Sequence, residues 1–560
     1  MVFFFAALLL GLSWLVAEHF PPWISWHNEV FAFAAVLWLS AAGIGISRNQ
    51  RKLRIPNAAL FFLCVGLLVC IQFALSQIDF FGDIAAISFY LTASIFALTC
   101  GFNAGLTTDS KVRNHVDYFA IVVVIGSVIS AVIVIAQVLE IWEGFDLISR
   151  MSSGRRPGAN LNQPNQLATL LLMGVVSLVY LFDARRLTSY PASFIALLLA
   201  IGFSITESRT GLISFMGIVA WWVVRKRRHG SRISLPVTLV ASGVFAAAFW
   251  FWPRIYTYIF AGGIPVVGVA KVDTSVGTRM VVWPQLMDAA MLHPWFGWGA
   301  GGVSKAQNAV IDKYVSGEPF TYAHNIILDL VIGFGIPIAF LLVAFVTVWL
   351  WKRVRLTKDL VTWYGLAIAL PLGVHSMLEF PFAYAYLLFP VVFMIGVVEA
   401  RVVPVQIVQF PRWLASAGVF ICLVVMGWSV LEYVKIEEDF RVARFESLGM
   451  GKTPDEYQRP TVFILTQLDA LSEVTRTVPA PGMKPDRIEL IRKVAIRFPG
   501  PATQNRYALS LALNGYTEEA RRQIKVIRTL HGEATYRAIM QKWHILEDTK
   551  YPQLREFIEP

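Results

Sequence analysis

Four basic side chains, far apart in the sequence, have the chemistry best suited to a reaction. Arg156 and Arg209 lie beside apolar stretches, Arg279 lies in a long loop, and His324 lies where that loop ends. Arginine can bind two phosphate oxygens at once, and a histidine can accept a proton from a hydroxyl near neutral pH. Gathered at one membrane surface, these groups could hold a phosphate-bearing lipid head group and activate a nucleophile.

A group of amides follows the first of these arginines. Residues 156–166, RPGANLNQPNQ, begin with a helix-breaking Pro-Gly pair and include Asn160, Gln163 and Asn165. Side-chain amides and exposed backbone N–H groups bind anionic or hydroxylated ligands. Asn165 is also suited to cap the helix that follows, whose positive end would then face the ligand. The alternative is a simple turn and helix cap.

Other polar residues accompany the histidine and a later apolar stretch. Tyr322 lies close to His324 in the sequence and could bind substrate. His375 and Glu379 are four residues apart and share one helical face if the helix continues. Tyr384 could bind a sugar or a lipid head group, or serve as an interface aromatic. The alternative for His324, taken alone, is an interfacial histidine whose hydrogen bonds are made to the backbone or to water.

The arginines have structural interpretations as well. Glu207 could form a salt bridge with Arg209, because an arginine at that depth is costly unless it is paired or faces a polar cavity. Arg279 alone is consistent with a solvated loop cation. Lys271 and Lys305 are weaker additions to the cationic group.

The composition requires a membrane protein. The chain has 560 residues, of which 56% are hydrophobic and 15% charged. Many apolar stretches are long enough to cross the roughly 30 Å apolar slab, and helices are the plausible spans because barrel-like alternation is missing. We expect an all-α polytopic protein with about 13 spans. They lie near residues 2–17, 29–46, 56–75, 83–103, 117–140, 165–182, 189–205, 210–224, 235–252, 326–351, 360–375, 384–400 and 413–431.

Charge orients these spans. The net charge of +11 is concentrated in short loops on one side, which the positive-inside rule makes cytoplasmic, so it does not indicate nucleic-acid binding. The amino terminus is then inside, and the first apolar stretch is expected to remain as a span. Cations on the outer side oppose the rule, which indicates a function for them. The four cysteines fall in apolar stretches and predict neither a disulfide framework nor a metal site.

Three regions follow from this topology. Residues 1–140 are N-terminal spans, and 141–432 form a catalytic membrane core with an outer loop at 253–325. Residues 433–560 form a soluble outer domain. This domain should contain two helices joined at Asn514–Gly515, similar to a tetratricopeptide hairpin, and we expect it to pack on the long loop. The loop itself should contain a short helix at VVWPQLMDAAMLH.

Several catalytic motifs are absent from the sequence. We find no phosphate loop, no HExxH zinc helix and no Asp-x-Asp pair. The sequence therefore predicts neither a metal nor a cofactor. A lipid donor whose pyrophosphate is itself the leaving group would need no nucleotide.

Several of these motifs resemble those of a known family. The segments ESRTG, GTRMVVWP, HPWFGWGAGG and YAHN resemble the core of the O-antigen ligase and polymerase superfamily. The segments RRPGANLNQPNQLAT and HSMLEFPFAYAY, with the helical tail, resemble its protein-glycosylating branch, the bacterial protein O-oligosaccharyltransferases. The resemblance covers most of the chain after about residue 150.

This resemblance implies a function. It implies en bloc glycan transfer from an undecaprenyl-pyrophosphate-linked oligosaccharide to serine or threonine hydroxyls of an acceptor protein such as pilin. The reaction would occur at the periplasmic side of the bacterial inner membrane, among membrane lipids. His324 would be the essential histidine, Arg209 and Arg279 the pyrophosphate-binding arginines, and Gln163 and Tyr384 further functional residues. Inversion at the anomeric carbon without a metal is the expected mechanism.

Three other functions remain open. An O-antigen ligase that modifies lipid A core, or an O-antigen polymerase, would use the same cations. A transporter of the lipid-linked glycan also needs a polar site between helices. A transporter would more naturally carry its ionisable residues near the middle of the membrane, whereas these cluster at one end of the spans.

Overall fold

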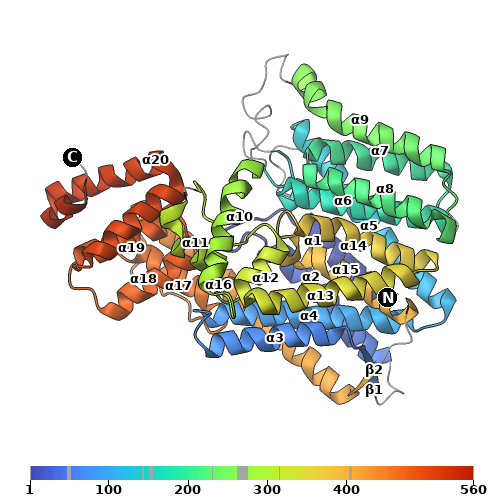
Figure 1. Ribbon diagram of the computed structural model, residues 1–560, viewed down its shortest axis with the longest axis horizontal. Helices are drawn as coiled ribbons and strands as arrows, with labels where there is room; N and C mark the ends of the chain where they lie inside the picture. Colours follow the sequence, from blue (N-terminus) through green and yellow to red (C-terminus); the bar gives the residue numbers. More distant parts are fainter. Residues whose placement is uncertain are drawn as a thin grey trace. The chain divides into compact units, whose positions relative to one another are not determined.

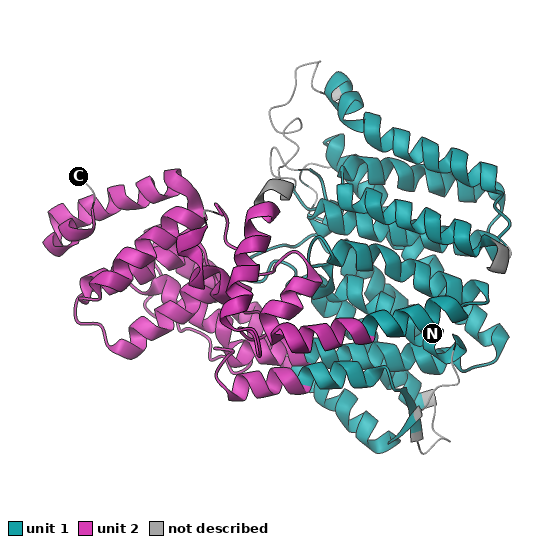
Figure 2. Ribbon diagram, in the orientation of Figure 1, with its two compact units in different colours: residues 1–66, 89–273, 346–427 teal, residues 67–88, 274–345, 428–560 magenta. Residues whose placement is uncertain are grey.

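The protein is almost entirely helical (Figure 1). The computed structural model describes residues 2–46, 52–141, 144, 146–150, 156–229, 231–260, 275–314, 316–402 and 407–558. Packing divides the chain into two compact units, each assembled from three stretches of sequence (Figure 2). Unit 1 comprises residues 1–66, 89–273 and 346–427, and unit 2 comprises residues 67–88, 274–345 and 428–560.

Unit 1 is a bundle of apolar helices. In a membrane every backbone polar group must bond within the segment, so long apolar stretches become helices. Helices α3 (Ala59–Ala74), α4 (Phe81–Gly105), α13 (Ile336–Leu356) and α16 (Arg412–Ser447) have residues in both units. The other elements of unit 1 are α1 (Val2–Leu15), α2 (Trp26–Ile46), β1 (Lys52–Pro56), α5 (Asp109–Val138), η1 (Ala159–Leu161), α6 (Pro164–Asp183), α7 (Ser189–Thr206), α8 (Arg209–His229), α9 (Leu235–Phe260), α14 (Leu360–Ser376), η3 (Pro381–Ala383), α15 (Ala385–Val402) and β2 (Ile407–Pro411).

The helices match the expected polytopic architecture. Among the described residues, nine helices are long and apolar enough to cross a membrane, and α1, α3 and α14 are shorter apolar helices. Helix α6 is 83% buried over its apolar window, whereas α9 and α13 are each 6% buried. Helix α6 is therefore central in unit 1, and α9 and α13 present the apolar surfaces that suit contact with lipid.

One predicted helix is wrong in its continuity. Residues 326–351 were expected as a single span, but α12 (Ile326–Phe334) ends before Gly335 and α13 begins after it. Gly335 has a φ of 82°, and a Cβ there would lie 2.5 Å from the carbonyl carbon of Trp295. Ile336 N–H donates to the carbonyl of Pro294 at 2.7 Å. The close approach of the preceding loop breaks the helix, and the nine-residue α12 is too short to span.

The basic loops of unit 1 meet at one end of the bundle. Strands β1 and β2, which come from two of these loops, pair antiparallel with Leu53 opposite Phe410. Arg401 bonds to both Asp109 and Asp359, at 3.0 and 2.8 Å. These contacts join four of the loops that the charge pattern assigns to one side.

Unit 2 combines the long loop with the C-terminal helices. As predicted, the loop contains a helix, α10, and two C-terminal helices are separated at Asn514–Gly515, where Gly515 has a φ of 82°. Pro284 lies within α10. The elements are α10 (Ser275–Leu292), α11 (Val303–Ala309), η2 (Ile311–Lys313), α12, α17 (Thr466–Arg476), α18 (Pro485–Arg497), α19 (Pro501–Leu513), α20 (Thr517–Thr549) and η4 (Pro552–Phe557).

The C-terminal helices pack on the long loop, as expected. Ser304 donates to the carbonyl of Ile496 at 2.6 Å, and Lys525 pairs with Asp312 at 3.0 Å. Ile311 is buried in a small apolar cluster with two residues of α20. The part of the loop that follows residue 274 is therefore packed within unit 2.

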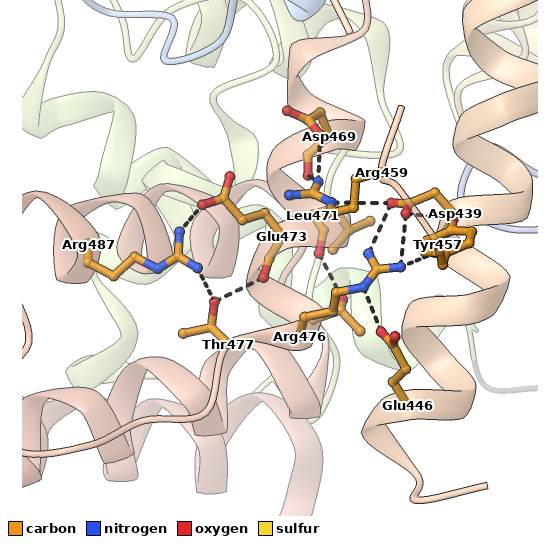
Figure 3. Close-up of polar contacts among 11 residues, drawn as sticks. Asp439, Glu446, Tyr457, Arg459, Asp469, Leu471, Glu473, Arg476, Thr477 and Arg487 are labelled. Carbon is orange, nitrogen blue, oxygen red and sulfur yellow. Dashed lines mark hydrogen bonds and ion pairs between the residues drawn. The ribbon is translucent and has the colours of Figure 1, made fainter. Parts of the chain in front are cut away.

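A network of charged residues fixes the extramembrane end of α16 to the C-terminal helices (Figure 3). The buried carboxylate of Asp439 accepts two hydrogen bonds from Arg476, at 2.9 and 3.0 Å, and one from Tyr457 at 2.9 Å. Arg476 also pairs with Glu446 at 2.6 Å. Since Asp439 and Glu446 belong to α16, these contacts anchor the C-terminal part of that helix to α17 and the segment before it.

Candidate functional site

The predicted site residues fall into two groups, one in each unit. In unit 2, His324 lies in residues 322–325, which we call the histidine turn, directly before α12. Its φ is 53°, in the left-handed region that non-glycine residues seldom adopt and that costs about 1–3 kcal/mol. Phe320 packs edge-on against the imidazole, with 5.2 Å between ring centroids. Asn325 caps α12 by accepting hydrogen bonds from two backbone N–H groups of its first turn.

The residue before the histidine is held at both of its backbone groups. Ala323 is buried; its N–H donates to Asp329 Oδ1 at 2.9 Å, and its carbonyl accepts from Trp283 Nε1 at 2.9 Å. Burial raises the pKa of Asp329 to about 7, and the N–H of Ala323 opposes that rise. The conformation of the histidine turn is thus fixed by side chains from two helices.

The same contact relates Arg279 to the histidine. Arg279 is half-buried on α10, four residues before Trp283 and hence on the same face of that helix. Because Trp283 bonds to the backbone beside His324, this face is turned toward the histidine turn. The structure therefore brings together the segments that carry two residues predicted to be catalytic.

A glycine-rich turn holds α10 and α12 beside each other. Trp298 N–H donates to the carbonyl of Ile332 at 2.7 Å, and its indole Nε1 donates to the carbonyl of Ala289 at 2.9 Å. Gly297 lies so close to α12 that a Cβ there would be 2.5 Å from the oxygen of Ile332. The sequence HPWFGWGAGG is therefore explained by close packing between the two helices that carry Arg279 and Asp329.

The remaining residues expected in unit 2 have the following positions. Tyr322 is half-buried and interacts electrostatically with the guanidinium of Arg497. Lys305 forms an ion pair with Asp79 at 2.6 Å, which accounts for that lysine structurally. Lys271 lies outside the described residues.

In unit 1, the amides of residues 156–166 bond to a carboxylate. Glu379 accepts a hydrogen bond from Gln163 Nε2 at 3.1 Å on one oxygen and from Asn165 Nδ2 at 2.5 Å on the other. His375 Nε2 lies 3.0 Å from the first oxygen, so the expected contact between His375 and Glu379 is present. Thr169 Oγ1 lies 2.8 Å from His375 Nδ1. We call these five residues the carboxylate cluster.

Hydrogen-bond balance assigns the donors in the carboxylate cluster. An ionised carboxylate only accepts, so His375 Nε2–H donates to Glu379. The Thr169 hydroxyl donates to the carbonyl of Asn165 at 3.1 Å and contacts the second imidazole nitrogen. Glu379 then receives three donors from two helices and the loop. Such a network holds its amides in one orientation.

The predicted N-cap of α6 is wrong, because the observed cap lies two residues earlier in the chain. Asn165 was suited to cap this helix, but the cap is Gln163, whose Oε1 accepts from Gln166 N–H at 2.7 Å. Pro164 occupies the first helical position, which suits proline because its missing N–H has no helical partner there. Asn165 therefore lies inside the first turn and bonds to Glu379 instead of capping the helix.

Asn160 is buried beneath the same loop. Its Nδ2 donates to the carbonyls of Leu15 and Leu147, at 2.6 and 2.8 Å, and its Oδ1 accepts from Ser149 N–H at 3.1 Å. His19 Nε2 lies 2.7 Å from its backbone oxygen. The geometry supports a positioning role, in which Asn160 ties the amide-rich loop to the end of α1.

Two arginines lie near the start of α8. Arg156 is exposed and donates to the carbonyl of Glu207 at 2.8 Å, and Arg209 is the exposed first residue of the helix. Burial raises the pKa of the Glu207 carboxyl, and the charge of Arg156 opposes the rise. Among the described residues there is no ion pair between Glu207 and Arg209. A cation at a helix N-terminus opposes the helix dipole, and an anion bound there would relieve that repulsion.

Residues 380–386, which we call the aromatic corner, lead into α15 and are also held by hydrogen bonds and ring contacts. Tyr384 stacks on Phe380 with 5.9 Å between ring centroids, and Tyr386 donates to Gln166 Oε1 at 2.6 Å. Between the tyrosines, Ala385 N–H donates to the buried carboxyl of Glu29 at 2.7 Å. The carbonyl of Tyr386 accepts from Trp14 Nε1 at 2.8 Å.

Sequence reasoning missed several of these supporting residues. Glu29 was detectable, because a carboxyl inside an apolar helix is costly and usually has a specific partner. Trp14, Trp283 and Thr169 carry no local signal, since their roles depend on contacts far away in the sequence. In the described part of the chain, no three His, Cys, Asp or Glu side chains gather as metal ligands.

Comparison with known proteins defines the class. Residues 194–343 match the O-antigen ligase family model, and residues 363–545 match the C-terminal model of virulence factor membrane-bound polymerases. Residues 157–182, which contain the amide-rich loop, match the protein glycosylation ligase model. Together with the apolar helical fold, these matches define a multi-pass membrane glycosyltransferase of the O-antigen ligase type.

Two relatives narrow the class further. The chain is 25% identical to a general O-oligosaccharyltransferase of Acinetobacter baylyi over 543 residues, covering 94% of this chain and 91% of the relative. It is 31% identical to a ComP-specific O-oligosaccharyltransferase of the same organism over 360 residues, covering 63% and 64%. The chain is thus similar over nearly its whole length to a bacterial O-oligosaccharyltransferase, and residues 157–182 and 194–343 carry the protein glycosylation ligase and O-antigen ligase signatures.

Proposed function

We propose that this chain transfers a preassembled glycan from an undecaprenyl-pyrophosphate-linked oligosaccharide to serine or threonine hydroxyls of a periplasmic protein such as pilin. The observation that carries the proposal is the contact between Trp283 and Ala323, which joins the arginine-bearing face of α10 to the histidine turn. A cation and a proton acceptor are the two groups that this reaction requires. The similarity to two O-oligosaccharyltransferases supports a protein acceptor.

The mechanism divides into leaving-group and nucleophile activation. Arg209 and Arg279, with Arg156, bind the pyrophosphate and stabilise the negative charge that builds as the bond from the anomeric carbon to phosphate breaks. His324 accepts the proton of the acceptor hydroxyl as its oxygen attacks that carbon. Attack from the opposite side inverts the configuration, with neither a covalent enzyme intermediate nor a metal.

The other predicted residues bind or position substrate. Gln163 and Asn165, oriented by Glu379 and His375, are proposed to contact the hydroxyls of the glycan or the acceptor. Tyr322 and Tyr384 add aromatic surfaces, and Asn160 holds the loop. The protein is proposed to be a multi-pass inner-membrane protein. Its amino terminus lies in the cytoplasm, and its active site and C-terminal helices lie in the periplasm.

The test compares two acceptors in separate reactions. Purified protein is mixed with lipid-linked oligosaccharide and with either pilin or lipid A core, and intact masses are measured. We expect pilin to gain the mass of the whole glycan. A mass gain on lipid A core alone would identify a ligase instead. Movement of labelled donor across a vesicle membrane with no transfer would favour a transporter.

A further inference from the structure

His324 is held in a strained backbone conformation. Histidine tolerates a positive φ better than most side chains, but the conformation still costs free energy and persists only where the surroundings over-determine it. Strain of this kind is concentrated at functional sites. Specific groups around the turn must therefore stabilise this conformation.

The first such group is Asp329. Its Oδ1 accepts the N–H of Ala323 at 2.9 Å, which closes the turn onto the first turn of α12. Its Oδ2 is buried and has no hydrogen-bond partner among the described residues. A buried carboxyl with a single backbone bond stabilises the fold poorly, because desolvation offsets most of what the bond contributes. The acid is therefore better explained by the conformation that it imposes on the turn than by stability.

The second group is Trp283. Its indole N–H donates to the carbonyl of Ala323, so the peptide groups on both sides of that residue are fixed. The same side chain lies one turn from Arg279 on α10. Trp283 therefore sets both the conformation of the histidine turn and its position relative to the arginine.

We infer that Asp329 and Trp283 are positioning residues for the transfer reaction: by binding the two backbone groups of Ala323, they hold His324 in its left-handed conformation beside Arg279. This inference rests on the proposed role of His324. Neither side chain need touch substrate. Their loss should therefore reduce the rate of the chemical step and leave donor binding nearly unchanged.

The experiment compares four variants of the full chain, purified in detergent, with lipid-linked oligosaccharide and acceptor protein as substrates. Asp329→Ala removes the acceptor for Ala323 N–H, whereas Asp329→Asn keeps an oxygen there. Trp283→Phe removes the indole donor and keeps a ring. Trp38→Phe is the matched control, because it removes an indole hydrogen bond to a backbone carbonyl, that of Val2, in unit 1. Amide hydrogen exchange of the peptide that contains Ala323 reports the turn independently of activity.

Asp329→Ala and Trp283→Phe should lower kcat about ten- to a hundredfold, with the donor KM changed by less than about threefold. Asp329→Asn should restore most of kcat, Trp38→Phe should match the wild type, and the Ala323 amide should exchange faster only in Asp329→Ala. Wild-type kcat in both Asp329→Ala and Trp283→Phe would overturn the inference, as would an equal loss in Trp38→Phe or unchanged exchange in Asp329→Ala.

A separate variant distinguishes this inference from the proposed function. His324→Asn keeps a residue that tolerates a positive φ but removes the proton acceptor. We expect it to be inactive with normal exchange of the Ala323 amide. Wild-type activity in His324→Asn would overturn the proposed role of His324 and, with it, the inference. An inactive His324→Asn beside fully active Asp329 and Trp283 variants would overturn the inference alone.

Discussion

The histidine turn of unit 2 and the aromatic corner of unit 1 are built by the same device. At each, a buried carboxyl accepts a backbone N–H and an indole donates to a nearby carbonyl: Asp329 and Trp283 at Ala323, and Glu29 and Trp14 at residues 385 and 386. Both devices fix the main chain next to a residue predicted to act in the reaction.

The two regions differ in what else is fixed. In unit 1 the polar side chains bond to one another around Glu379, which gives a network with three donors on one carboxylate. In unit 2 the described contacts fix the backbone beside His324, whose φ is strained. Rigid side chains suit recognition, whereas a strained and braced turn suits a group that must meet a transition state. This comparison predicts different consequences for changes in the two regions.

Among the residues that support the two regions, the centre of the carboxylate cluster should have the largest effect. Glu379→Ala leaves the amides of Gln163 and Asn165 without their acceptor, so transfer should fall about a hundredfold and stability by about 1–3 kcal/mol. Transfer rate and thermal unfolding in detergent would be measured. Glu379→Gln should be nearly as damaging, because its own N–H₂ would meet other donors.

An exposed acid is the control for this variant. Glu438→Ala removes a carboxylate that pairs only with the exposed Arg441 in the described structure, and it should behave as the wild type. If Glu379→Ala kept both wild-type transfer and wild-type stability, the carboxylate cluster would have no role in either.

The acid in the aromatic corner should have a smaller effect. Glu29→Leu removes the acceptor for Ala385 N–H and loosens the segment that carries Tyr384, so the transfer rate should fall about tenfold. Glu29→Gln retains an oxygen in the same place and should restore most of the rate. A loss in Glu29→Gln as large as that in Glu29→Leu would mean that the hydrogen bond is not what matters.

Arg156 should affect donor binding more than the chemical step. Arg156→Lys keeps the charge but loses the paired donors, so the donor KM should rise about three- to tenfold with kcat little changed. Steady-state kinetics against lipid-linked oligosaccharide would measure this. Arg185→Lys, an exposed substitution in a basic loop, is the matched control. Equal KM values in the two variants would remove Arg156 from the donor site.

The smallest effect is a pH dependence of stability. Because burial raises the pKa of Asp329 above its unfolded value, the folded chain binds more protons than the unfolded chain between about pH 4 and the folded value of about 7. The contribution of this group to stability is full below that window and is lost as the pH rises through 7. Thermal unfolding of wild type and Asp329→Asn at pH 5 and pH 8 should show wild type losing stability relative to the variant. A difference that is the same at both pH values would contradict this.

The sequence predicted the elements better than the contacts between them. Apolar stretches long enough to span became helices, because hydropathy measures the transfer of side chains into an apolar medium. The break at Gly335 was missed, since it depends on the approach of the loop at Trp295 rather than on local composition. The choice of Gln163 over Asn165 as the cap of α6 likewise depends on backbone geometry.

The site was predictable in its residue types and less so in its supports. Arginines on the predicted outer side were informative because they oppose the orientation rule, and the spacing of His375 and Glu379 gave their contact directly. Trp283 and Trp14 act through hydrogen bonds to distant backbone groups, which no local pattern encodes. Such partners are found only when the chain is folded.

The proposed reaction depends on basic side chains that stabilise a departing lipid pyrophosphate. The most direct measurement is mass spectrometry of the lipid released when wild type and Arg279→Ala act on lipid-linked oligosaccharide and acceptor protein. We predict undecaprenyl pyrophosphate equimolar with glycosylated protein in the wild-type reaction, and neither product with Arg279→Ala. Release of the lipid monophosphate as the direct product, or wild-type yields from Arg279→Ala, would contradict the account.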